Sequence, residues 1–160
     1  MGVTEGMLLP ALDEDSAPFW EACGRGELRG QRCDGCGRLR FPPRPLCPWC
    51  RTFEHTWVLL SGRGTIWSFV IPHPPLLPAY GAQAPYNVIV VTIDEDPTIR
   101  LVGNLVPAAG APLNALDPHT IEIGERVEVV FEPVEGDGDG SPPIALPRWI
   151  RLRDEPRAPG

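Results

Sequence analysis

Two Cys-x-x-Cys pairs lie within residues 33–50 and are separated by ten residues. Each Cys-x-x-Cys turn presents two sulfurs from one loop. Two such turns folded against each other place four thiolates at the corners of a tetrahedron, the arrangement typical of structural zinc. Gly37 follows the first pair, where backbone N–H groups approach the sulfurs. The spacing therefore predicts one metal site whose ligands are Cys33, Cys36, Cys47 and Cys50.

The pattern leaves three kinds of site open. A structural zinc site is closed, because protein sulfur fills all four positions and no water binds. A tetrathiolate also suits iron, as a single ion or a cluster. A redox Cys-x-x-Cys usually opens a helix after a strand, and Pro48 with Trp49 inside the second pair is atypical of that context. We expect structural zinc, and we expect Cys23, outside the pattern, to be a buried thiol.

Composition excludes several classes of protein. The 21 prolines and 17 glycines predict a chain rich in turns and loops. All 14 basic residues are arginine, which excludes a Schiff-base lysine and a phosphate-loop lysine. The acidic N-terminus does not look like a signal peptide, and no segment approaches the roughly 20 apolar residues of a membrane helix. These features predict a cytoplasmic protein that does not span a membrane.

The net charge of −7 is unevenly distributed. Residues 25–63 hold eight arginines and three acidic residues, whereas residues 94–139 hold eleven acidic residues and two arginines. A basic patch on an acidic protein can meet a phosphate group or an acidic partner surface, or it can simply be solvated. An extended nucleic-acid footprint usually needs a more basic domain, so the charge argues against nucleic acid as the main partner.

The segment SAPFWEACGRG predicts a helix of about two turns. Ser16 is the expected N-cap, Pro18 fits the first turn, and Gly24 ends the helix. Phe19 and Trp20 are adjacent, so they cannot share one narrow face and must be buried against the chain itself or against a partner. We therefore divide the chain into a lead-in with a short aromatic helix (1–26), a zinc ribbon (27–53), a barrel (54–152) and a tail (153–160).

From residue 55 the pattern becomes that of β-strands. Short segments rich in β-branched and aromatic residues are separated by glycine and proline, and Pro147 favours an edge position for the last segment. Five or six short strands in about 95 residues fit a small closed barrel of OB type. The expected fold is mostly β, with a short N-terminal helix, a rubredoxin-like four-cysteine ribbon and an OB barrel. The expected strands are HTWVLL, TIWSFVIP, YNVIVVTID, TIRLVGNLV, RVEVVFEPV and IALPRWIRL.

The sequence offers no convincing catalytic set. His55, His73 and His119 lie outside any metal-binding spacing, and Ser61 and Ser68 lack a nucleophile-elbow context. The run DEDP fits a hairpin tip better than a pair of catalytic carboxylates. These residues indicate that the chain is not an enzyme on its own.

The order of the segments is similar to that of one known family. PFWEACGRGELRGQRCDGCGRLRFPPRPLCPWC is followed by SGRGTIWSFVI, APYNVIVVTIDEDPTIRLVGNLV, IGERVEVVFEPV and LPRWIRL. This order resembles the OB-fold acyl-CoA-associated family with an N-terminal rubredoxin-like zinc ribbon, formerly a domain of unknown function. The resemblance covers about residues 16–152, with FPPR and GRGT as distinctive motifs. It implies an aromatic helix, an OB barrel and zinc bound by the four cysteines.

The resemblance also implies a role in acyl-CoA metabolism, in a complex with a thiolase-like enzyme or a hot-dog-fold enoyl-CoA hydratase. The chain resembles in particular the stand-alone form that accompanies steroid side-chain aldolases, which are thiolase-like lyases acting on a CoA thioester. The expected function is that of a non-catalytic subunit that stabilises such a partner, in a 2:2 complex by analogy, and helps form its CoA-thioester channel. No catalytic residue carries over, because those residues lie in the partner.

Candidate contact residues follow from this expectation. Guanidinium groups pair with phosphate oxygens, so the arginine-rich ribbon can attract CoA, and the proline-rich loop 72–85 and the barrel face can line the pantetheine path. The candidates for CoA binding or the channel are Arg44, Trp49, Arg63, His73 and Tyr86, and those for the partner interface are Phe19 and Trp20.

A different class of function uses the same modules. OB barrels and zinc ribbons also bind single-stranded nucleic acid, and Trp49, Trp57 and Trp67 are candidates for stacking on bases. The acidic barrel half argues against this alternative.

Overall fold

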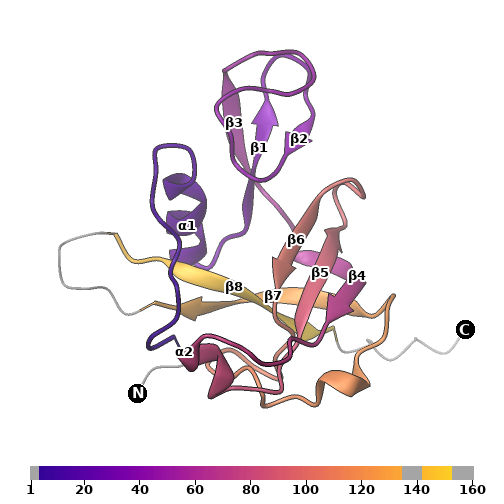
Figure 1. The fold of residues 1–160 in the computed structure, drawn as a ribbon. Coiled ribbons are helices and arrows are strands. Elements are labelled where there is room, and N and C mark those ends of the chain that lie inside the picture. The colour runs from indigo at the N-terminus through magenta and orange to yellow at the C-terminus, as the bar shows by residue number, and fades with distance from the viewer. Residues whose placement is uncertain (1–3, 135–141, 153–160) are drawn as a thin grey trace, which may run out of the picture.

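The computed structural model describes residues 4–134 and 142–152, which form two antiparallel sheets and three short helices (Figure 1). The segment EGDGDGS and the expected tail lie outside the described residues. The elements are α1 (Ala17–Gly24), β1 (Arg29–Cys33), β2 (Leu39–Arg40), β3 (His55–Leu59), β4 (Arg63–Val70), α2 (Pro78–Gly81), β5 (Val88–Ile93), β6 (Arg100–Gly103), the 3-10 helix η1 (Pro118–Thr120), β7 (Arg126–Pro133) and β8 (Ala145–Arg151).

Helix α1 lies where the sequence predicted it, but its start differs in detail. Ser16 occupies the N-cap position without a side-chain capping bond. Instead its N–H and hydroxyl donate to Oδ1 of Asp13, at 2.7 and 2.6 Å. The predicted N-cap position of Ser16 is therefore confirmed, although its hydroxyl bonds to Asp13 and not to an N–H of the helix. The helix ends at Gly24, where any Cβ would collide with the backbone of Pro143, ahead of β8.

The first sheet has the order β2-β1-β3 and forms the ribbon, which projects from the rest of the molecule (Figure 1). Strand β1 pairs antiparallel with both neighbours, so that Arg32 lies opposite Leu39 and Gln31 opposite Trp57. At its base the ribbon is joined to the core by Leu60, whose N–H donates to the carbonyl of Leu28 at 2.8 Å. The ribbon therefore leaves the barrel on a paired stem.

The second sheet has the order β6-β5-β4-β7-β8 and curls into a barrel. A parallel bridge between Leu105 and Trp149 brings its two ends together, supported by a bond from the N–H of Val106 to the carbonyl of Trp149 at 2.8 Å. Gly103 is required at this seam, because a Cβ there would lie 2.8 Å from the indole ring of Trp149. The prediction of a short-stranded OB barrel is confirmed, with five strands. The expected barrel strand HTWVLL is instead β3 of the ribbon sheet, because it pairs with β1.

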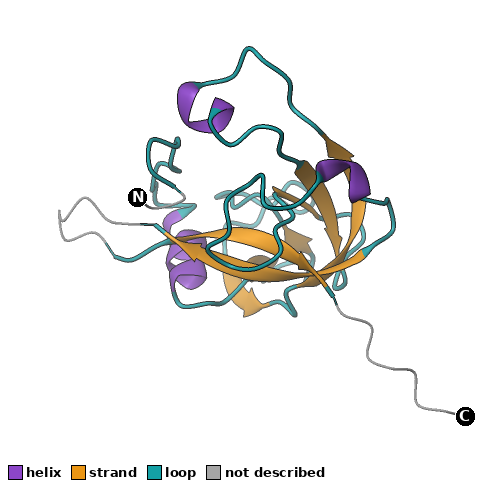
Figure 2. Cartoon of the chain, turned by 90° about the horizontal axis from the view of Figure 1, so that it is seen from below, coloured by secondary structure: helices purple, strands orange, loops and turns teal. Residues whose placement is uncertain are grey.

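The inner residues of β5 and the helix share one core. Ile89, Val91 and Ile93 alternate inward along β5 and are fully buried, as a half-buried strand requires. Phe19 and Cys23 of α1 belong to the same apolar cluster. Figure 2 shows α1 lying against the barrel strands. The helix is thus part of the barrel core.

The lead-in packs more closely than its sequence indicates. Met7 is buried in a second apolar cluster with Tyr86 and Leu113, and residues of the proline-rich loop, including α2, pack around them. Part of the lead-in is therefore packed against the proline-rich loop through Met7.

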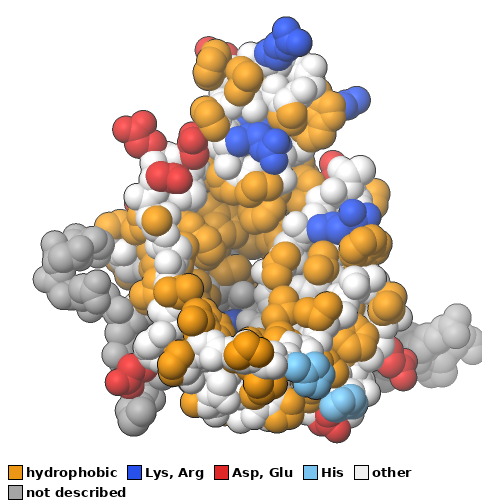
Figure 3. Space-filling view, viewed as in Figure 1, with side chains coloured by type: hydrophobic (Ala, Val, Ile, Leu, Met, Phe, Trp, Pro, Cys, Tyr) orange, Lys and Arg blue, Asp and Glu red, His pale blue; other side chains and the backbone are white. Residues whose placement is uncertain are grey.

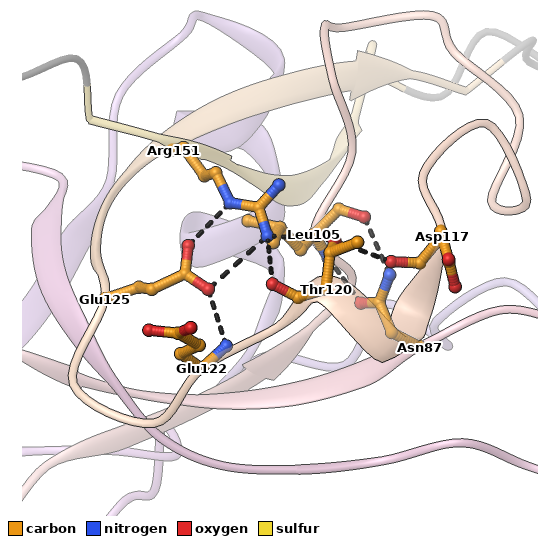
Figure 4. Close-up of polar contacts among 7 residues, drawn as sticks. All are labelled: Asn87, Leu105, Asp117, Thr120, Glu122, Glu125 and Arg151. Carbon is orange, nitrogen blue, oxygen red and sulfur yellow. Dashed lines mark hydrogen bonds and ion pairs between the residues drawn. The ribbon is translucent and has the colours of Figure 1, made fainter.

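Separate groups of polar contacts hold the loops of the barrel (Figure 4). The amide of buried Asn87 accepts from the N–H of Leu105 at 2.7 Å and donates to its carbonyl at 2.9 Å. Arg151 of β8 donates to Glu125 and to the carbonyl of Thr120, which anchors η1.

Among the described residues, no helix has both the length and the apolar character needed to cross a membrane.

Candidate functional site

The four predicted cysteines converge at the tip of the ribbon. Cys33 ends β1, Cys36 follows in the next turn, and Cys47 and Cys50 come from the loop before β3. Their four Sγ atoms all lie within 4.8 Å of one another. The Sγ atoms of Cys33 and Cys50 are 3.4 Å apart, and those of Cys36 and Cys47 are 3.7 Å apart. These distances are too long for disulfides, whose S–S bond is about 2.05 Å.

The sulfur positions fit a tetrahedral metal ion. With a Zn–S bond of about 2.3 Å, a regular tetrahedron has edges of about 3.8 Å, close to the observed separations. The donor set is entirely thiolate, which suits zinc or iron and leaves no position for water or substrate. The residues therefore fit the expected ion, whose binding would stabilise the ribbon without supplying a reactive site.

Backbone geometry makes the two turns nearly equivalent. Gly37 after Cys36 has φ of 74° and donates its N–H to the carbonyl of Cys33 at 2.9 Å. Arg51 after Cys50 has φ of 62° and donates to the carbonyl of Cys47 at 3.0 Å. The sequence reasoning noted Gly37 but missed Arg51. The sequence does contain a signal for Arg51, because it directly follows its Cys-x-x-Cys pair, as Gly37 does.

The thiols differ in their ease of ionisation. Oγ1 of Thr52 lies 3.4 Å from Sγ of Cys50, and its hydrogen bond to the thiolate lowers the pKa of Cys50 to about 6. Burial raises the pKa of Cys23 to about 12. Cys23 lies in the barrel core, so it is an inert apolar side chain there, as expected.

The arm between the two cysteine pairs is fixed by buried polar groups. The side chain of Gln31 accepts from the N–H of Arg44 at 3.0 Å and contacts Nε2 of His55 at 3.1 Å. Arg40 is 1% exposed, and its Nη2 donates to the carbonyl of Phe53 at 3.4 Å. These contacts hold the arm against β1 and β3.

The five candidates for CoA contact do not form one cluster. Trp49 is half exposed at the ribbon tip, with the guanidinium of Arg38 at 5.2 Å from its ring centroid. Arg63 and His73 are exposed, and Arg44 is half-buried in the arm. Tyr86 is 6% exposed and lies inside the second apolar cluster. Among the described residues, the structure records no hydrogen bond or ring contact between any two of the five candidates.

The two candidates for a partner interface lie differently. Phe19 is 3% exposed, and its ring packs edge-on against Trp20 and Phe41, with centroids at 4.9 and 5.4 Å. Trp20 is half-buried at the margin of the same cluster. Of the two, only Trp20 presents part of its ring to solvent.

Two of the three histidines, His55 and His119, make recorded local contacts, and His73 is exposed. His55 is held by Gln31 and by the carbonyl of Phe53, and Nδ1 of His119 lies 3.0 Å from Oδ1 of Asp117. His119 and Asp117 are both largely exposed, and the hydrogen bonds of His119 lower the pKa of Asp117. This pair tightens the turn of η1.

One face of the molecule is hollowed. Figure 3 shows a depression between α1, the ribbon and the β5–β6 side of the barrel, lined mainly by apolar side chains. Arginines gather on the ribbon above it. An apolar hollow with basic groups at its rim has the character needed to receive an apolar chain that carries phosphates.

These features define a class of protein, an OB barrel joined to a rubredoxin-like four-cysteine ribbon. The sequence matches the family models described as "ChsH2, rubredoxin-like zinc ribbon domain" over residues 20–56 and "ChsH2, C-terminal OB-fold domain" over residues 57–132. The chain belongs to the ChsH2/DUF35 family.

Relatives of known description support this assignment. A DUF35 domain-containing scaffold protein of Methanocaldococcus jannaschii is 33% identical over 70% of this chain and 72% of its own length. A probable enoyl-CoA hydratase alpha subunit of Thermomonospora curvata is 37% identical over 86% of this chain. A 3-oxo-4,17-pregnadiene-20-carboxyl-CoA hydratase alpha subunit of Mycobacterium tuberculosis is 33% identical over 79% of it. The chain spans 39% and 37% of these two subunits.

A solved structure shows the same fold. A chain described as "Ltp2-ChsH2(DUF35) aldolase" superposes with a TM-score of 0.70 and 35% sequence identity. The match covers 89% of this chain and 98% of that chain.

Proposed function

We propose that this chain is a non-catalytic subunit that binds and stabilises a thiolase-like acyl-CoA enzyme and helps form its CoA-thioester channel. One observation carries the proposal. A solved chain described as "Ltp2-ChsH2(DUF35) aldolase" is 35% identical to this chain, and the match covers 98% of that chain. In the finer form of the proposal, the partner is a carbon–carbon lyase that acts on steroid side-chain CoA thioesters, in a 2:2 assembly.

The four-cysteine centre supports a structural role. Cys33, Cys36, Cys47 and Cys50 would hold one zinc ion through four thiolates. Zinc supplies binding free energy on the order of 10–16 kcal/mol in small zinc-finger peptides, and this becomes folding free energy. A ribbon of this size buries too little apolar surface to fold reliably without such a contribution. The ion would keep the basic ribbon in a fixed position above the hollow.

The hollowed face supports a channel role. Its lining is apolar and its rim carries the ribbon arginines, so it can accommodate a pantetheine arm below and CoA phosphates above. Arg44 and Trp49 lie on the ribbon, while Arg63 and His73 offer exposed polar groups on the barrel and its proline-rich loop. Tyr86 would act indirectly, by packing the proline-rich loop against Met7.

A second candidate partner is an enoyl-CoA hydratase of the hot-dog fold. Two relatives described as hydratase alpha subunits are 37% and 33% identical to this chain. The chain would then have the role of the segment of such a subunit that it matches. Both candidates share the chemistry of an acyl-CoA substrate bound mainly by the partner.

The test is co-purification followed by an activity assay. The full chain, tagged and expressed in its native host, is isolated, and its partners are identified by mass spectrometry. We expect a thiolase-like subunit in equimolar amount, and cleavage of a CoA thioester that requires both proteins. A hot-dog-fold partner with hydration activity would select the second candidate. Turnover of an acyl-CoA by the isolated chain would contradict both.

A further inference from the structure

The barrel carries an exposed apolar surface on the outer side of β4, β5 and β6. Trp67 and Val70 of β4 are 52% and 59% exposed, and Val102 of β6 is 65% exposed. Val90 of β5 lies opposite Val102 in the register. We call Trp67, Val70, Val90, Val102 and Arg100 the outer face.

The strand pattern shows that this face is unusual for a solvated surface. Along β5 the residues Ile89, Val91 and Ile93 point inward, so Val88, Val90 and Thr92 point outward. An antiparallel sheet with one side in water normally alternates apolar with polar residues, whereas β5 is apolar on both sides at most of its positions. Such a strand is typical of a sheet that is covered on both faces.

Arg100 is the one charged member of the outer face. Its guanidinium carbon lies 3.9 Å from the ring centroid of Trp67, a stacked cation–π arrangement. Among the described residues, Arg100 belongs to none of the recorded ion pairs. Tryptophan and arginine are the residue types that most often dominate the energy of protein–protein interfaces. The pair is therefore pre-ordered, and the described part of the chain records no hydrogen bond or ion pair for the guanidinium of Arg100.

Charge distinguishes the kinds of partner that could cover the outer face. The chain has a net charge of −7, and Glu95 and Asp96 lie in the turn from β5 to β6, beside Asp94, which is paired with Arg126. Nucleic acid would be repelled by this acidic border, and a second copy would bring a like-charged face with its own Arg100. An apolar surface of a different protein that carries a carboxylate opposite Arg100 complements the outer face both in apolar character and in charge.

We propose that the outer face is the docking surface for the acyl-CoA enzyme subunit, with Trp67 as its central anchor and a partner carboxylate paired with Arg100. This inference rests on the proposed function, because that function supplies the partner. Docking on β4–β6 places the partner beside the hollowed face, since the hollow in Figure 3 lies next to the position that β5 and β6 occupy in the same view in Figure 1.

The experiment measures binding between the full chain and the acyl-CoA enzyme subunit that co-purifies with it, by isothermal titration calorimetry. Trp67→Asp and Val102→Glu place a charge on the outer face, and Leu8→Glu is the matched control at another exposed apolar position in the lead-in. We expect Trp67→Asp and Val102→Glu each to raise Kd by at least about 30-fold, and Leu8→Glu to raise it by less than about threefold. Circular dichroism and metal content of each variant establish that it is folded.

Oxidative footprinting of the unmodified complex provides a second measurement. The peptide that contains Trp67 should lose at least about half of its oxidation when the partner is bound. Wild-type affinity in both outer-face variants, or unchanged oxidation of Trp67, would overturn the inference. So would a dimer of the isolated chain that Val102→Glu dissociates. If no acyl-CoA enzyme subunit co-purifies at all, the proposed function fails. If the subunit binds and the outer-face substitutions leave its affinity unchanged, only this inference fails.

Discussion

Gly37 and Arg51 occupy equivalent backbone positions, each directly after the second cysteine of a Cys-x-x-Cys pair. Both have positive φ, 74° and 62°, and both donate an N–H to the first cysteine of their pair. Glycine adopts this left-handed conformation without a steric penalty, whereas a residue with a Cβ is strained there by about 1–2 kcal/mol. One half of the metal site is thus built with the favourable residue and the other half without it.

Exchanging these residue types should change stability in opposite directions. Arg51→Gly should stabilise the metal-bound chain by about 0.5–1 kcal/mol, because relief of strain exceeds the entropic cost of an added glycine. Gly37→Arg should destabilise it by a similar amount, since a Cβ at Gly37 meets no atom within 4 Å and the effect is purely conformational. Urea unfolding at fixed zinc concentration measures both. Arg51→Ala is the control that removes the guanidinium and keeps the strain, and a stabilising Arg51→Ala would contradict the backbone explanation.

Asn87 should be essential for the barrel seam. Its amide satisfies both backbone groups of buried Leu105, so Asn87→Ala leaves a donor and an acceptor unpaired. Each unpaired buried group costs about 1–3 kcal/mol, and we expect a total loss of about 2–4 kcal/mol in the free energy of unfolding. The exposed Asn114 is the matched control, whose replacement by alanine should change stability by less than about 0.5 kcal/mol. Equal effects of the two substitutions in thermal unfolding would show that the seam does not depend on Asn87.

The ion pair between Asp94 and Arg126 should contribute to the acid sensitivity of the barrel. Both guanidinium Nη atoms lie 2.6 Å from the carboxylate oxygens, and the bond to Arg126 lowers the pKa of Asp94. Because the folded pKa is depressed, the contribution is fully present above the unfolded pKa of about 3.9 and is lost as the pH falls through the lower folded value.

Both partners are more than one third exposed, so solvent screening limits the contribution to about 1 kcal/mol or less. Replacing Arg126 by glutamine should therefore raise the pKa of Asp94, measured by NMR titration. The stability difference from the parent chain should shrink below about pH 4. A difference that stays constant down to pH 2 would assign the effect of the substitution to packing.

The features predicted correctly from the sequence are those that depend on local chemistry. The four-cysteine cluster follows from spacing alone, because a Cys-x-x-Cys turn fixes two sulfurs within one loop. Strand β5 follows from its β-branched run, and α1 from Pro18 and Gly24 at its two ends.

The features that were missed depend on contacts between distant segments. The bridge from Leu105 to Trp149 closes the barrel across more than forty residues, and nothing in either segment indicates the other. The burial of Met7 likewise depends on its packing against the proline-rich loop. The candidates for CoA contact were chosen by residue type, and residue type does not reveal that Tyr86 faces the interior. The pairing of Trp67 with Arg100 required the register of three strands.

The central claim is that four thiolates enclose one ion and leave it chemically closed. The most direct test is metal analysis of the purified chain together with X-ray absorption at the metal edge. We predict one zinc per chain, coordinated by four sulfurs at about 2.3 Å, lost in Cys47→Ser and retained in Cys23→Ala. A chain without metal, or an ion with an oxygen or nitrogen ligand in place of a sulfur, would contradict it.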